Sequence, residues 1–166
     1  MLNYKIIYII AFLFQVPVLL AQVEPPLIFT DNMVLQQQTD AAIWGKTSPD
    51  KTVRIVTSWN NKAYVIKSDV NGKWKVNVST PVAGGPYEIT ISDGQEVKLK
   101  NVLIGEVWVC SGQSNMEMTL RGYRKGNDHE NAIANANYNN IRILHINKEL
   151  STQPLDELKK TRGGWI

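Results

Sequence analysis

The chain has 166 residues, a formal net charge of +3 and a single cysteine, Cys110. This length is too short for two large domains, and the dispersed charge contains no Lys/Arg block of the kind that nucleic-acid binding requires. One cysteine excludes an internal disulfide, and no His/Cys cluster has the spacing of a metal site. We therefore expect no nucleic-acid partner, no metal and no cofactor, and we expect Cys110 to be a buried residue of a core strand.

The first 21 residues have the layout of a secretory signal peptide. MLNYK carries a cation, and the apolar run from Ile6 to Leu20 is shorter than the roughly 20 residues of a spanning helix. We expect cleavage after Ala21, which leaves a secreted or periplasmic protein without membrane attachment. An uncleaved N-terminal anchor is the alternative interpretation.

Residues 22–103 alternate short two-faced segments with turn signals, which is typical of a β-sandwich of the jelly-roll or immunoglobulin-like type. Asn71-Gly72 and Asp93-Gly94 are expected at hairpin tips, because Asn-Gly and Asp-Gly favour tight turns. Two sets of residues are predicted to face inward from their strands, namely Trp74, Val76 and Val78, and Tyr87, Ile89 and Ile91. The predicted strands cover residues 41–45, 52–59, 63–70, 73–80, 87–92 and 95–110.

Residues 104–166 have the pattern of the first strand, helix and strand of an incomplete α/β domain. Val107–Cys110 is expected to be its first parallel strand. A helix is predicted to begin near Asp128, where an apolar stripe follows polar residues. NNIRILHI, residues 139–146, is a nearly continuous apolar run and predicts a second parallel strand covered on both faces.

The segment GEVWVCSGQSNMEM places a polar, glycine-containing turn directly after an apolar strand. Ligands of open α/β sheets bind at the carboxyl ends of the strands, so a side chain in this turn is well placed for chemistry. Gly112 permits a sharp turn, and Ser114 then presents its hydroxyl and its own N–H at a helix N-terminus. Ser114 is therefore the candidate nucleophile, and Ser111, which lies before the glycine, is its nearest rival.

Several segments of the chain occur in the order and spacing of one known family. They are FTDNMVLQQ (29–37), IWG (43–45), NGKWKV (71–76), GGPYEIT (84–90) and GEVWVCSGQSNMEM (105–118). Together they resemble the N-terminal portion of the sialate O-acetylesterase family, and NIRILHI with the later RGGW resembles the next part of its members. The long GEVWVCSGQSNM match is the most specific part of the resemblance.

The resemblance implies a Ser-Gly-Asn-His type hydrolase that removes acetyl groups from sugar hydroxyls. Its partner would be an O-acetylated glycan or sialic acid. Ser114 matches the nucleophile of the family, and Gly112 and Asn115 match residues that shape its nucleophile block. Gln113 stands where related esterases often carry Asp. The fold implied is an N-terminal β-sandwich followed by an α/β hydrolase domain that begins at residue 104.

The resemblance also implies catalytic groups that this chain does not contain. The Asp-x-x-His of the family lies further downstream, and neither His129 nor His145 follows an Asp at that spacing. We therefore expect the N-terminal fragment of a serine carboxylic-ester hydrolase that is inactive by itself. The alternative is a non-catalytic glycan-binding or interaction module, with Trp44, Trp59 and Trp74 as a sugar-stacking platform. Within that set we expect Trp74 in the core and Trp59 exposed.

Overall fold

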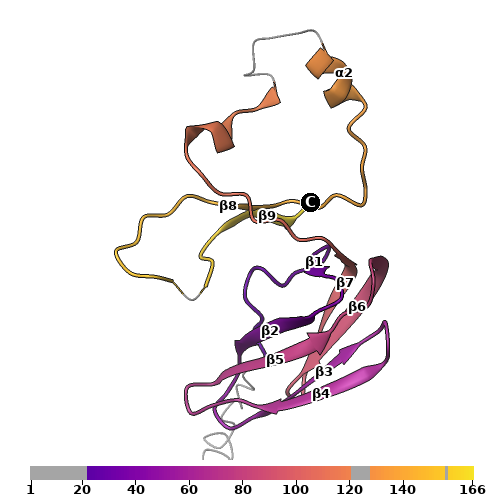
Figure 1. Ribbon diagram of the computed structural model, residues 1–166. Helices are drawn as coiled ribbons and strands as arrows, with labels where there is room; N and C mark the ends of the chain where they lie inside the picture. Colours follow the sequence, from indigo (N-terminus) through magenta and orange to yellow (C-terminus); the bar gives the residue numbers. More distant parts are fainter. Residues whose placement is uncertain (1–21, 121–127, 156) are drawn as a thin grey trace, which may run out of the picture.

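The computed structural model describes residues 22–120, 128–155 and 157–166, and the chain is mainly β over these ranges. The predicted signal peptide, residues 1–21, lies outside the described residues. Figure 1 shows a strand-rich unit at one end of the molecule and a smaller part beyond it that carries the helices. No helix in the described ranges has the length and apolar character needed to cross a lipid bilayer.

The strand-rich unit is built from short segments rich in Val, Ile, Thr and Tyr, which favour extended backbone. The predicted strands are confirmed in this unit, except that the last one ends at Gly105 instead of Cys110. The strands are β1 (Val34–Gln36), β2 (Asp40–Lys46), β3 (Thr52–Thr57), β4 (Lys62–Lys67), β5 (Lys73–Ser79), β6 (Gly84–Ser92) and β7 (Glu96–Gly105).

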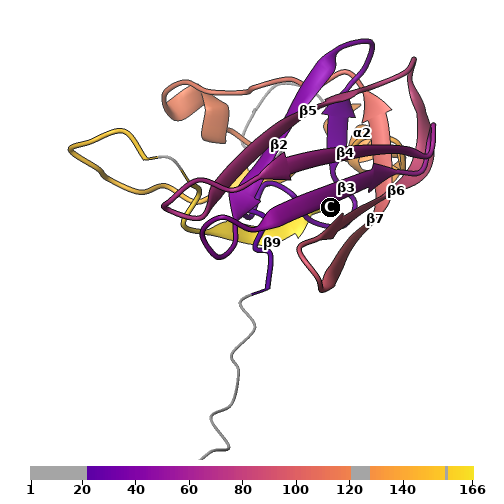
Figure 2. The same cartoon turned by 90° about the horizontal axis from the view of Figure 1, so that it is seen from below.

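These strands form two sheets that pack against each other (Figures 1 and 2). The larger sheet has the order β1-β7-β6-β3-β4, and the smaller one pairs β2 with β5. Neighbouring strands run antiparallel except for β1 and β7, which are parallel with Val34 opposite Leu103. The chain therefore crosses between the sheets several times.

The core lies between the sheets and is filled by alternate residues of each strand. Trp74 and Val78 of β5 are 3% and 0% exposed, and Ile89 and Ile91 of β6 are fully buried, so both predicted inward faces are confirmed. Removing these side chains from water is the main stabilising contribution. The same cluster includes Val23, Phe29, Met33, Leu35, Ile43, Val53, Ile55, Leu99 and Val102.

The tryptophans of this unit are used in its own packing. Trp74 is buried, as predicted. Trp44 packs edge-on against Phe29, with ring centroids 4.6 Å apart. The exposure predicted for Trp59 is wrong, because its ring is half-buried against Tyr87 and its indole N–H donates to a backbone carbonyl at 2.9 Å. The three rings therefore do not form an open platform.

Of the two predicted hairpin tips, one is confirmed and one is wrong. Asp93-Gly94 connects β6 to β7, where Ser92 is opposite Glu96. Asn71-Gly72 connects β4 to β5, which belong to different sheets and do not pair with each other. The Asn-Gly turn therefore carries the chain from one sheet to the other.

The reason lies in the contacts of this turn. The Asp69 carboxylate accepts the backbone N–H groups of Asn71 and Lys73 at 2.8 and 2.9 Å, which closes the turn on a side chain. Thr47, at the end of β2, donates its backbone N–H to the Gly72 carbonyl at 2.9 Å. The turn is thus anchored to the smaller sheet, and β5 pairs with β2.

The structure contradicts the predicted parallel strand at Val107–Cys110. No strand of the described ranges pairs with this segment. Trp108 is 82% exposed, Val109 is 91% exposed, and Cys110 is exposed instead of buried. A parallel strand needs partners on both edges and cover on both faces, and an apolar run alone supplies neither.

The remaining elements are η1 (Ser114–Glu117), α2 (Asp128–Ala134), β8 (Leu144–Ile146) and β9 (Thr161–Trp165). The helix predicted near Asp128 is confirmed. The prediction of a covered parallel strand over 139–146 is wrong, because β8 is short, pairs antiparallel with β9 and is mostly exposed. The nearby RGGW segment supplies the partner strand that local patterning had not indicated.

Several side chains attach the β8–β9 hairpin to the strand-rich unit, and among them Glu157, in the loop between the two strands, pairs with Lys46 of β2 at 2.7 Å. Trp165 donates its indole N–H to the Ile28 carbonyl at 2.9 Å, and the Arg142 guanidinium donates to the Asn32 carbonyl at 3.1 Å. Both carbonyls belong to the loop that precedes β1. The hairpin therefore lies beside the end of the larger sheet, as Figure 1 shows.

We expect Gly72→Ala to lower the free energy of unfolding by about 2 kcal/mol more than Gly94→Ala. Both glycines have positive φ, +75° and +124°, which costs any L side chain. A Cβ at Gly72 would also lie 2.0 Å from the Thr47 carbonyl oxygen, whereas one at Gly94 meets nothing within 4 Å. Urea unfolding followed by tryptophan fluorescence measures both. Equal losses would contradict the anchoring role of the Gly72 turn.

Candidate active site

The candidate nucleophile, Ser114, is the first residue of the 3-10 helix η1. Gln113 before it is extended, with φ −100° and ψ −152°, and its carbonyl accepts the Met116 N–H at 2.9 Å. The first turn of any helix leaves backbone N–H groups without partners inside the helix. The hydroxyl of Ser114 and such N–H groups therefore lie together on an exposed turn.

Gly112 lies in close contact with the side chain of Met116 within this turn. A Cβ at this position would lie 2.7 Å from Cγ of Met116, whose side chain packs across the glycine. The carbonyl of Asn115 accepts the Met118 N–H at 3.3 Å and closes the end of η1. The four predicted site residues thus lie on one turn, and their chemical roles stay predictions. They are Gly112, Gln113, Ser114 and Asn115.

An ion pair connects η1 to the segment after β8. Glu117, within η1, pairs with the ammonium group of Lys148. The hydrogen bond and the charge of Lys148 lower the pKa of Glu117 below its ordinary value, and the charge of the nearby His145 adds to this effect. Because both side chains are well exposed, we assign this pair an orienting role and only a small contribution to stability.

The histidines do not complete a catalytic pair within the described ranges. His129 lies in α2 with its Nε2 3.9 Å from Oε1 of Glu130. His145 lies in β8, and its charge acts on the Glu117 carboxyl of η1 by lowering the pKa of that group. Among the residues that the structure describes, Ser114 Oγ has no hydrogen-bond partner, and neither histidine bonds to it.

A polar cluster that sequence analysis missed lies where β7 leads into the Ser114 segment. Gln36 and Gln37, at the end of β1, donate side-chain N–H groups to the Glu106 carboxylate at 3.2 and 2.6 Å. The side-chain carbonyl of Gln36 accepts the Val107 N–H at 2.9 Å. We call Gln36, Gln37 and Glu106 the Gln-Glu cluster. It fixes the direction in which the chain leaves the sheet toward Ser114.

The sequence gives one indication of the Gln-Glu cluster: its three residues lie in two of the segments that resemble the family. The glutamines end FTDNMVLQQ, and Glu106 stands in GEVWVCSGQSNMEM. The bonded residues are 69 and 70 positions apart along the chain, so no local pattern could pair them. Only the parallel pairing of β1 with β7 brings the two motifs together.

The two amide donors hold the pKa of Glu106 below its ordinary value of 4.5, and Gln37 is the larger cause. A carboxyl group whose pKa is lowered by folding contributes stability above its unfolded pKa. That contribution is lost as the pH falls through the lower, folded pKa. The Gln-Glu cluster is therefore intact at neutral pH and weakens only in acid below pH 4.5.

We expect an NMR titration of the Glu106 carboxyl carbon to give a midpoint below 4.5 in the intact chain. Gln37→Ala removes the stronger donor and should raise the midpoint toward that ordinary value. Gln38→Ala is the matched control, because Gln38 follows Gln37 in the chain and does not bond to Glu106. An unchanged midpoint in Gln37→Ala would show that the Gln-Glu cluster does not form in solution.

Comparisons with known proteins give a consistent result, although no family model matches the chain. The chain is 33% identical over 147 residues to the sialate O-acetylesterases of Pongo abelii and Homo sapiens. It is 30% identical over 148 residues to that of Mus musculus. These matches cover 81–82% of this chain and 27% of each relative. The chain thus spans about a quarter of the length of the curated relatives it matches.

The fold leads to the same group of proteins. A carbohydrate acetylesterase from Xanthomonas citri, known from a crystal structure, matches with a TM-score of 0.77 and 33% sequence identity. That match covers 87% of this chain and 32% of the other. Sequence and fold together confirm the resemblance found in the motifs. The chain belongs to the sialate O-acetylesterase family and matches about a quarter of the length of its curated relatives.

Proposed function

We propose that this chain is a segment of an exported carbohydrate O-acetylesterase that cleaves acetyl esters on sugar hydroxyls through Ser114. The observation that carries the proposal is the position of Ser114. It begins η1 directly after an extended Gln113, within the motif that most specifically resembles the family. The names of the matched relatives, sialate O-acetylesterase and carbohydrate acetylesterase, support the reaction and the sugar substrate.

In the proposed reaction, the Ser114 hydroxyl attacks the acetyl carbonyl carbon. A general base takes the hydroxyl proton as the Oγ–C bond forms, and the carbonyl oxygen becomes an oxyanion. Backbone N–H groups at the start of η1 and the side chain of Asn115 are the proposed donors to that oxyanion. The sugar oxygen leaves with the proton, and water then releases acetate from the acyl-serine. Gly112 and Gln113 shape the turn that holds Ser114.

We also propose a domain organisation that fits this function. Residues 1–21 form a cleaved signal peptide, so the protein is secreted or periplasmic. Residues 22–103 form an immunoglobulin-like β-sandwich, and residues 104–166 begin the α/β hydrolase domain. The parallel pairing of β1 with β7 at the edge of the β7-β6-β3-β4 sheet, opposite the β2–β5 pair, supports the immunoglobulin-like arrangement over a jelly roll.

The alternative function, a non-catalytic glycan-binding module built on its tryptophans, receives no support from the rings themselves. Trp74 is buried, Trp44 packs against Phe29, and Trp59 packs against Tyr87. A sugar-stacking platform needs exposed ring faces lying side by side. We therefore retain the esterase as the proposed function of this segment.

In a longer relative that carries the same GQSN motif, we expect replacement of the serine equivalent to Ser114 by Ala to lower kcat/KM by about 10⁴-fold or more. The reason is that no other group supplies the attacking oxygen. The equivalent of Ser111→Ala is the matched control and should cost far less, because that serine precedes the Gly112 turn. Release of acetate from an O-acetylated sugar measures both. Equal losses would show that the wrong hydroxyl was assigned.

For the 166-residue chain itself, we expect no hydrolysis of a chromogenic acetyl ester above that of its Ser114→Ala variant. A general base typically contributes about 10²- to 10⁴-fold, and the Ser114 hydroxyl has no base bonded to it within the described ranges. His129→Ala tests one candidate substitute base. Turnover that requires both Ser114 and His129 would contradict the expectation and reveal a catalytic pair.

A further inference from the structure

The segment that carries Ser114 is exposed along its whole length. Residues 106–120 are all exposed, and η1 buries none of its own residues. Burial of apolar surface therefore does not fix the position of η1. One end of the segment is held where the side-chain carbonyl of Gln36 accepts the Val107 N–H at 2.9 Å. The position of the Ser114 turn then depends on contacts at the other end.

The Glu117–Lys148 ion pair is a contact at that other end. Lys148 follows β8 by two residues, and the neighbouring Asn147 donates its backbone N–H to the Lys160 carbonyl at 3.2 Å across the β8–β9 hairpin. The ammonium group of Lys148 thus comes from backbone that the hairpin holds. The hydrogen bond from Lys148 lowers the pKa of Glu117, so the pair is charged at neutral pH.

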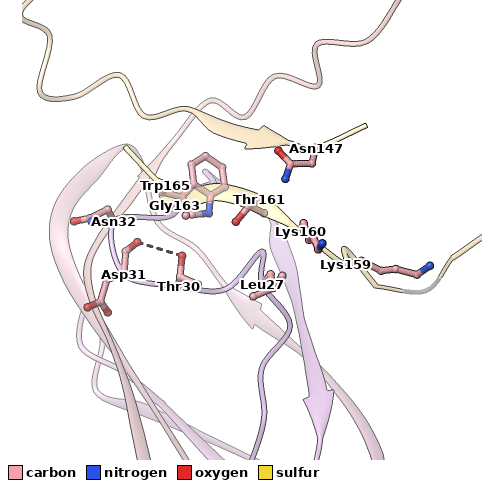
Figure 3. A pocket seen from close by; sticks show the side chains of 11 residues that line it. Leu27, Thr30, Asp31, Asn32, Asn147, Lys159, Lys160, Thr161, Gly163 and Trp165 are labelled. Atoms are coloured by element: carbon pink, nitrogen blue, oxygen red, sulfur yellow. Dashed lines mark hydrogen bonds between the residues drawn. The ribbon is translucent and has the colours of Figure 1, made fainter. Parts of the chain in front are cut away.

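The hairpin is in turn held on the strand-rich unit by individual side chains. A cleft of about 590 Å³ lies between the hairpin and the loop of residues 27–32, so part of the surface between them is open (Figure 3). Beside the cleft, Trp165 donates to the Ile28 carbonyl, and Arg142 donates to the Asn32 carbonyl and to the side chain of Asn101. Figure 1 shows the hairpin between the strand-rich unit and η1.

We propose that the β8–β9 hairpin is a positioning element through which the strand-rich unit determines where the Ser114 turn lies. Arg142 and Trp165 fix the hairpin on the loop before β1, and Lys148 fixes η1 on the hairpin. Arg142, Trp165 and Lys148 are positioning residues, because their bonds go to the loop, to β7 and to Glu117. The catalytic value of this arrangement rests on the proposed function, whereas the position of η1 is measurable without turnover.

One exposed ion pair is sufficient for this role. Such a pair typically changes an equilibrium by about two- to fivefold. Because η1 buries no residue, it loses little when it leaves the hairpin, and a factor of this size changes the fraction of molecules in which η1 is docked. A displacement of about 1 Å can lower the rate of an enzyme by about 10²-fold. A weak contact at η1 therefore has a large effect on a reaction at Ser114.

The test measures ¹⁵N order parameters of the backbone amides of residues 114–117 in the 166-residue chain. Lys148→Gln should lower them by about a quarter, the difference between a rigid and a flexible backbone, whereas Lys148→Arg keeps the cation and should preserve them. Glu117→Gln should match Lys148→Gln, and the double variant should lose no more than either, because both changes remove one interaction. Lys159→Gln is the matched control, since it removes the exposed Lys159–Glu149 ion pair after β8 without a contact to η1.

A second variant tests the link between the hairpin and the strand-rich unit. Arg142→Lys combined with Trp165→Phe removes the fork and the indole N–H that reach the loop, and it should lower the order parameters of η1 together with those of β8. Unchanged signals from β3, β5 and β6 confirm that the strand-rich unit is folded. Ser114→Ala should change none of these values, so failure of the esterase proposal leaves the result intact.

Three results would overturn the proposal. The first is an η1 that keeps its order in Lys148→Gln or that loses it equally in the Lys159→Gln control. The second is a double variant, Glu117→Gln with Lys148→Gln, whose loss equals the sum of the single losses. The third is an η1 that stays ordered when Arg142→Lys is combined with Trp165→Phe.

Discussion

Strand β7 carries the constraint on which the rest of the structure depends, because both of its edges are already paired. It pairs with β6 on one edge and with β1 on the other, and its last residue, Gly105, is opposite Gln36. Because β1 ends at Gln36, it has no strand residue left to pair with the residues after Gly105. The Gln37 backbone N–H still donates to the Gly105 carbonyl at 2.8 Å, and the glutamine side chains then take over by bonding Glu106. Side chains thus replace a strand where the chain turns toward Ser114.

The same β1–β7 pairing also determines where the hairpin docks. It places Asn32 beside Asn101, and the two side-chain amides bond to each other at 2.7 Å. Both residues have positive φ, 67° and 56°, which asparagine tolerates better than most residues. Arg142 donates to the backbone of one and the side chain of the other. A planar guanidinium can reach two acceptors at once in this way, whereas a lysine ammonium lacks the fork.

Local sequence patterns predicted the strands and their inward faces because each depends on residues only two apart. Trp74 with Val78, and Ile89 with Ile91, are buried as the alternation requires. The pairing of β5 was not predictable in this way. Asn71-Gly72 has the composition of a hairpin tip, and only the contact between Thr47 and Gly72, together with the Asp69 carboxylate, directs β5 to the other sheet.

In the candidate site, too, some features depend on neighbouring residues and others on residues far away in the sequence. The turn around Ser114 needs only Gly112, the carbonyl of Gln113 and Met116, so a short motif suffices to specify it. A strand at Val107–Cys110 needs neighbours from elsewhere in a chain, and its apolar composition says nothing about whether they are present. A general base is likewise a long-range requirement. A short motif can therefore predict a candidate nucleophile, whereas the proposed reaction would depend on residues that only the tertiary structure brings to it.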